Sequence, residues 1–96
     1  MWPFSRRFPF REAPDTAAFT CCHVLAGATI LRVTHDDDDG AWQFLCGGEH
    51  DASEVRVIAL QEVYVLDASI GQLAKLPCGY VAQRSSKTGK WQIGEV

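Results

Sequence analysis

Ile30–His50, with the sequence ILRVTHDDDDGAWQFLCGGEH, is the stretch that carries the strongest fold signal of this chain. Two runs within it, Ile30–His35 and Ala41–Cys46, are rich in β-branched and aromatic residues and flank the segment Asp36–Gly40. An Asp-Gly pair between two such runs is typical of a β-hairpin. The sequence therefore predicts two antiparallel strands whose turn displays the carboxylates of Asp36, Asp37, Asp38 and Asp39.

Further elements are predicted on both sides of this hairpin. Strand composition indicates three more strands, at Ala18–Leu25, Val55–Ala59 and Gly79–Arg84. Helical spacing indicates a helix over Leu60–Leu66 and a second one over Ile70–Leu76, with Asp67 or Ser69 as its cap and Pro77 at its end. We therefore expect a single small α+β domain, an antiparallel β-sheet with a central hairpin and one or two short helices.

The chain length of 96 residues fits one domain. We expect an irregular aromatic and basic N-terminal tail over residues 1–14, the folded domain over residues 15–93, and a C-terminal tail over residues 94–96. Three prolines prevent a long helix in the first segment. Its aromatic and cationic side chains also suit an alternative role in peripheral membrane contact, through Trp2, Phe4, Arg6, Arg7 and Phe8.

Charge is distributed unevenly along the chain. The net charge is −3, and the segment from Asp36 to Asp67 holds nine acidic residues against the single Arg56. Such an acidic segment repels phosphate backbones, which argues against nucleic-acid binding. No secretory signal and no run of about 20 apolar residues is recognisable. We therefore expect no transmembrane segment, a cytoplasmic location and reduced thiols.

Cysteine and histidine residues suggest a zinc site as one hypothesis. Cys46 and His50 are spaced like half of a tetrahedral zinc site. The other half is less regular, because Cys22 and His23 are adjacent and would face opposite sides of a strand. The candidate ligands are Cys22 (or Cys21), His23, Cys46 and His50, and the alternative is that the protein holds no cofactor. A calcium loop at Gly40 is disfavoured, because His35 and Cys46 would replace two of its oxygen ligands.

Catalytic signatures are weak, and we expect a protein that is not an enzyme. Cys46 precedes two glycines, and His50 or His35 could act as its base. However, a reactive thiol needs a positive environment, and Cys46 lies in the acidic segment. The chain also contains no glycine-rich phosphate loop and no serine nucleophile motif.

Two blocks of the sequence resemble one bacterial domain family of unassigned function, related to the immunity protein 33-like proteins of polymorphic toxin systems. The first block is Asp39–Gly47, which resembles the family pattern Asp-x-Gly-Trp-x-Phe-x-x-Gly. The second comprises Ala59–Val63, Leu66–Ile70, Leu73 and Leu76–Arg84, and Ala68 stands where the family usually has proline. The resemblance spans roughly residues 18–84. It implies an antiparallel sheet with short helices on one face and, for some members, neutralisation of a toxin; it implies no catalytic residues.

These observations favour a small cytoplasmic, non-enzymatic binding protein, with a cognate toxin as its expected protein partner. Acidic side chains would steer the domain toward a basic surface. The candidate partner-binding residues are Asp36, Asp37, Asp38, Asp39, Glu49, Asp51 and Glu54. The alternative is a small zinc-binding accessory or regulatory domain. The sequence carries no signal for the oligomeric state.

Overall fold

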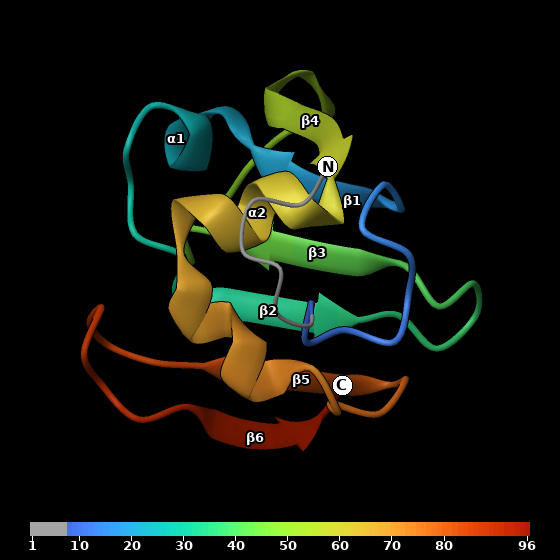
Figure 1. Cartoon of the computed structure of the whole chain (residues 1–96). Coiled ribbons are helices and arrows are strands. Elements are labelled where there is room, and N and C mark those ends of the chain that lie inside the picture. Colours follow the sequence, from blue (N-terminus) through green and yellow to red (C-terminus); the bar gives the residue numbers. More distant parts are fainter. Residues whose placement is uncertain (1–7) are drawn as a thin grey trace.

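The computed structural model describes residues 8–96, and within that range six strands form one sheet. The strands are β1 (Ala17–Cys21), β2 (Arg32–His35), β3 (Trp42–Leu45), β4 (Val55–Ala59), β5 (Tyr80–Gln83) and β6 (Gln92–Glu95). The helical elements are α1 (Cys22–Leu25), α2 (Leu60–Leu66) and the 3₁₀ helices η1 (Ala52–Glu54) and η2 (Ala68–Leu73). Figure 1 shows α2 and η2 in front of the sheet and α1 at one end of it. The α+β prediction is confirmed.

The strand order across the sheet is β4-β1-β3-β2-β5-β6. The predicted hairpin is present: β2 and β3 pair antiparallel, with His35 opposite Trp42 and Val33 opposite Phe44. All neighbouring strands are antiparallel except β1 and β3, which run in the same direction. Because β1 and β3 are parallel neighbours, their C-terminal ends lie side by side. The candidate metal ligands lie at these strand ends.

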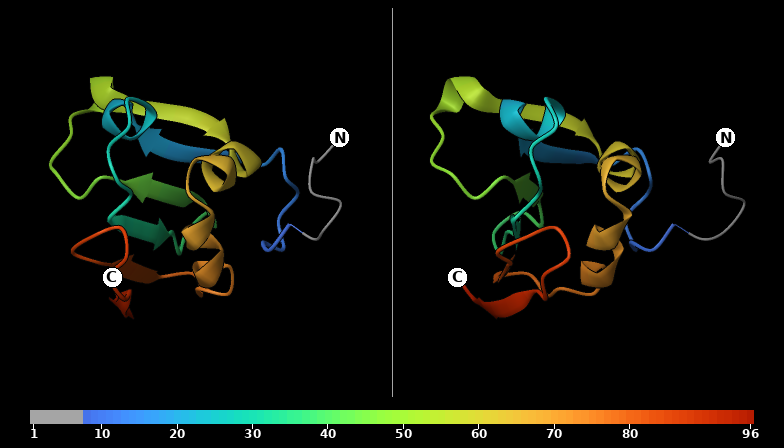
Figure 2. Two further views of the ribbon diagram at one scale, coloured as in Figure 1. Left: turned by 60° about the vertical axis from the view of Figure 1, so that its left-hand side comes forward. Right: turned by 90° about the vertical axis from the view of Figure 1, so that its left-hand side faces the viewer.

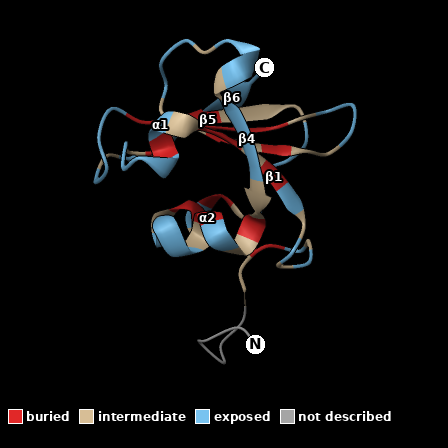
Figure 3. Cartoon of the chain, turned by 90° about the horizontal axis from the view of Figure 1, so that it is seen from above, coloured by how far each residue is buried: buried red, intermediate tan, exposed pale blue. Residues whose placement is uncertain are grey.

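Apolar side chains from one face of the sheet meet the helices in a single core. The views in Figure 2 show α2 and η2 on the same side of the sheet. In Figure 3 the residues of α2 that face the sheet are buried and those on its outer side are exposed. Burial of this apolar area is the main favourable term in folding. The buried core comprises Phe10, Ala18, Cys21, Val24, Ile30, Val33, Trp42, Phe44, Leu60, Val63, Ile70, Leu73, Leu76 and Ala82.

The irregular segment before β1 contributes one side chain, Phe10, to the core. Phe10 is buried, and its ring lies 5.1 Å from the Trp42 ring and 6.3 Å from the Phe44 ring. Phe8 packs against Phe10 and against Tyr64 of α2. Residues 8–14 form no helix or strand, as predicted, and aromatic packing of Phe10 offsets the loss of chain freedom in this segment. Trp2, Phe4, Arg6 and Arg7 of the membrane hypothesis lie outside the described residues. Residues 8–96 include no helix with the length and apolar character needed to cross a membrane.

The predicted strand Ala18–Leu25 ends early, at Cys21. The chain then turns into α1, where the Ala26 amide donates to the carbonyl oxygens of Cys22 and His23. Gly27, at a φ of 112° that favours glycine, ends this turn and leads the chain away from it. Val24 is the buried residue of this turn.

At the C-terminal end the prediction missed one strand. Val55–Ala59 and Leu60–Leu66 occur as predicted, whereas the predicted helix Ile70–Leu76 is the shorter η2, capped by Asp67. Gln92–Glu95 forms β6, so residues 94 and 95 belong to the sheet and not to a C-terminal tail. Ile93 is the one large apolar side chain of this edge strand. Its sequence therefore has no alternating pattern for sequence analysis to detect.

Arg84, directly after β5, connects three parts of the fold. Its buried guanidinium donates to the carbonyl oxygens of Ile30 and Lys87 and to the Asp67 carboxylate, the last at 2.7 Å. Its Cζ atom also lies 4.1 Å from the centre of the Trp91 ring. Burial alone would raise the pKa of Asp67, but hydrogen bonds from Ser69 together with the Arg84 ion pair outweigh burial and hold this pKa below its usual value.

Candidate metal centre

Four potential metal ligands converge where β1 and β3 end. Cys21 is the last residue of β1, His23 lies in α1, Cys46 follows β3, and His50 lies in the loop before η1. One ligand atom from each residue lies within 4.8 Å of all the others. Two of these residues are close because β1 and β3 are parallel neighbours. His23 is placed beside them by the helical turn α1, and His50 by the loop over residues 46–51.

The distances suit a tetrahedral ion. The Cys46 thiol sulfur lies 3.3 Å from His50 Nε2 and 4.0 Å from His23 Nδ1, and the two imidazole rings are 5.1 Å apart. Zinc bound to cysteine and histidine at about 2.0–2.3 Å places neighbouring ligand atoms roughly 3.3–3.8 Å apart. Small side-chain rotations therefore suffice to bring the four atoms around one ion. Two thiolates and two imidazoles are also the ligands that zinc prefers.

Glu54 orients one of these histidines from outside the ligand set. Its Oε2 atom lies 3.4 Å from His23 Nε2, so that His23 Nδ1 is the nitrogen that faces Cys46. The other carboxylate oxygen, Oε1, accepts a hydrogen bond from the Asp51 amide. A carboxylate on the outer nitrogen is a common partner of metal-binding histidines, because it fixes the tautomer and the ring orientation.

This role of Glu54 was not predicted, although the sequence contains a signal for it. Asp51 and Glu54 are spaced as a capping box, and both of its reciprocal hydrogen bonds are formed at the start of η1. The hydrogen bond from the Ser53 hydroxyl contributes most to holding the pKa of Asp51 below its usual value. The capping box thus gives Glu54 a defined position, within reach of the histidine on the neighbouring turn.

The structure brings Cys21 into the four-residue cluster, and not Cys22. The prediction placed both Cys22 and His23 on a strand, whereas they begin the helical turn α1. Cys22 instead forms a three-residue group with His23 and Glu54, whose ligand atoms also lie within 4.8 Å of one another. Of the predicted ligands, His23, Cys46 and His50 are brought together as expected.

The predicted acidic surface is divided between two ends of the molecule. Asp36–Gly40 precede β3 and Glu49–Glu54 follow it, so the two groups lie at opposite ends of that strand (Figure 1). The two groups are close along the chain, and the extended strand between them separates them in space.

The turn at residues 36–40 keeps most of its carboxylates accessible. Asp37, Asp38 and Asp39 are exposed, whereas Asp36 is half-buried and accepts a hydrogen bond from the Gln43 side chain. Asp39 accepts one from the Ala41 amide. Gly40 has a φ of 72°, which closes the turn. The turn therefore presents a small negative surface at a defined place.

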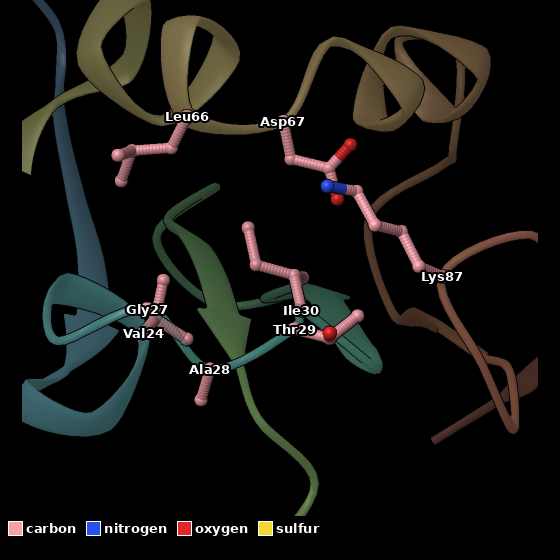
Figure 4. Close-up of a pocket in the computed structure, with 8 residues that line it drawn as sticks. All are labelled: Val24, Gly27, Ala28, Thr29, Ile30, Leu66, Asp67 and Lys87. Carbon is pink, nitrogen blue, oxygen red and sulfur yellow. The ribbon is translucent and has the colours of Figure 1, made fainter.

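A small pocket next to α1 is drawn in Figure 4. It has a volume of about 100 Å³, and Asp67 and Lys87 lie on its rim above the side chain of Ile30. Binding sites for small organic ligands usually measure about 300–1,000 Å³. The Asp67 carboxylate also already accepts from Arg84. This pocket adds no functional residues to the metal cluster.

No protein-family model, no curated protein and no solved structure matches this chain.

Proposed function

We propose that this chain is a zinc-binding domain in which Cys21, His23, Cys46 and His50 hold one ion. The proposal is supported above all by the distance of at most 4.8 Å between any two of their ligand atoms. Four protein ligands leave no open position for substrate, which is characteristic of a structural zinc site rather than a catalytic one. The ion would tie α1 to the loop that leads from β3 to β4.

Cobalt binding tests this assignment and separates the two cysteines. Purified wild-type protein is expected to bind one Co²⁺ per chain, with the visible absorption bands of a tetrahedral site, and zinc should displace it. Cys21→Ser is expected to lose these bands. Cys22→Ser is the matched control, because Cys22 is adjacent in sequence but lies outside the four-residue cluster, and it should bind like the wild type. Equal loss in both variants, or an octahedral spectrum in the wild type, would refute the four-ligand site.

A second candidate function is protein binding through the 36–40 turn, with a toxin as the partner. It is supported by the exposure of three adjacent carboxylates, Asp37, Asp38 and Asp39. It also rests on the resemblance of two sequence blocks to the immunity protein 33-like family. In this role the domain would act in the cytoplasm, without catalysis, by covering a basic surface of the toxin. Charge at the turn would mainly accelerate association.

Association kinetics test this second candidate with the protein encoded by the adjacent gene as the probe. The double variant Asp37→Asn/Asp38→Asn is expected to associate severalfold more slowly, with a weaker dependence of the rate on salt. The control Glu49→Gln/Asp51→Asn removes the same charge at the opposite end of β3, and its rate should stay close to that of the wild type. An equal effect of both variants, or an absence of binding by the wild type, would contradict the candidate.

A further inference from the structure

A second cysteine–histidine pair, formed by residues outside the metal cluster, lies at the edge of a larger pocket. The Cys78 thiol sulfur is 3.6 Å from His35 Nε2, and both residues line a pocket of about 410 Å³. Cys78 is exposed, whereas His35 is buried at the end of β2. The pair is formed by residues 43 positions apart, which explains why sequence analysis considered His35 only as a partner of Cys46.

His35 is held in the tautomer that a general base needs. Its Nδ1 atom lies 2.7 Å from the carbonyl oxygen of Leu76, which can only accept, so Nδ1 carries a hydrogen. In the neutral imidazole the lone pair is then on Nε2, the nitrogen that faces Cys78. The ring is stacked on Trp42, with 3.9 Å between the ring centres. This packing keeps the imidazole in place.

Glu12 supplies a negative charge close to the same nitrogen. Its Oε2 atom lies 3.7 Å from His35 Nε2 and accepts a hydrogen bond from the Trp42 indole at 3.0 Å. Its Oε1 atom is buried, and none of the described residues donates to it. Glu12 therefore lies on the same side of the His35 ring as Cys78. Cys78 and His35 thus have the arrangement of nucleophile and base, and the Leu76 carbonyl on Nδ1, not Glu12, orients the ring.

The lining of the pocket indicates what can reach the thiol. Arg11 and Lys75 contribute cationic side chains, and Pro9, Leu76 and Pro77 contribute apolar surface. A pocket of this size accommodates a small molecule or part of a peptide. The combination of positive charge and apolar contact favours an anionic ligand with some hydrocarbon character.

We propose that Cys78 is a reactive thiol, with His35 as its base, that forms a mixed disulfide with anionic low-molecular-weight disulfides. His35 Nε2 takes the proton of the Cys78 thiol, and the thiolate attacks one sulfur of the disulfide RS–SR. The S–S bond of the ligand breaks as the bond Cys78–S–S–R forms. The leaving thiolate RS⁻ takes the proton back from the imidazolium and departs as RSH. The ligand is the oxidant, and no further co-reactant is needed.

The wild-type test uses oxidised glutathione as the probe and intact-mass spectrometry as the readout. Peptide mapping assigns the modified cysteine. Cys78 is expected to react at least tenfold faster in the folded protein than in the same chain unfolded in urea, and Cys78→Ser should lack this fast phase. His35→Gln is expected to slow the reaction at least tenfold. A folded wild type that reacts no faster than the unfolded chain would overturn the proposal.

A surface variant keeps the test independent of any effect of His35→Gln on folding. Arg11→Gln/Lys75→Gln changes two exposed residues. We expect it to react severalfold more slowly with oxidised glutathione and at an unchanged rate with the neutral dipyridyl disulfide. Lys87→Gln/Lys90→Gln removes the same charge from exposed residues of the loop between β5 and β6 and serves as the matched control. Equal rates for both double variants with oxidised glutathione would exclude the anionic ligand class.

Discussion

Zinc added to the metal-free protein is expected to raise the midpoint of thermal unfolding by roughly 15 °C or more. A ligand that binds only the folded state stabilises it by about 4 kcal/mol when its free concentration is a thousand times the Kd. For a domain of this size each kcal/mol shifts the midpoint by about 4–8 °C. The effect should be large because the four ligands come from two segments, residues 21–23 and 46–50, which approach one another only in the folded chain. Calorimetry or circular dichroism measures the shift.

The control for this prediction is Cys46→Ser, which lacks the thiol that lies closest to His50. Its unfolding midpoint should be nearly insensitive to zinc, because three ligands bind the ion more weakly than four. Magnesium should leave both proteins unchanged, since it prefers oxygen ligands. A wild-type midpoint that zinc does not move would refute a structural metal site, whatever the spectrum of the cobalt form.

Arg84→Met is expected to lower the free energy of unfolding by about 3–5 kcal/mol, the usual cost of removing one partner of a buried ion pair. Methionine fills much of the same space, but it leaves the Asp67 carboxylate without its cation and the carbonyl oxygens of Ile30 and Lys87 without their donor. Because small domains have little stability in reserve, this loss is a large part of the total. Urea unfolding followed by circular dichroism measures it.

Arg56→Met is the matched control for this variant. Arg56 is exposed, and its guanidinium donates to the carbonyl oxygens of Ser53 and Val55 at the surface. Water can replace it there, so the free energy of unfolding should change by no more than about 0.5 kcal/mol. If both variants destabilised the protein equally, the contacts of Arg84 would not be what holds β5, η2 and the β5–β6 loop together.

The parts of the fold that could be predicted are those with a local physical cause. The 36–40 turn closes at a glycine with positive φ, and Trp42 and Phe44 alternate with more exposed residues along β3. Leu60 and Val63 show the spacing of a helix that buries one side. β6 carries no such pattern, and the burial of Phe10 depends on aromatic partners more than thirty positions away.

The sequence by itself determined the elements from Val55 to Leu66, the central hairpin and the types of residue that can bind a metal, since each follows from neighbours a few positions away. Only the tertiary structure decided that Cys21 joins the four-residue cluster, that the acidic groups lie apart, and that Cys78 meets His35. The physical reason is that strand order, including the parallel pair β1 and β3, arises from burying one common core. That order sets which distant residues meet, and no local pattern contains it.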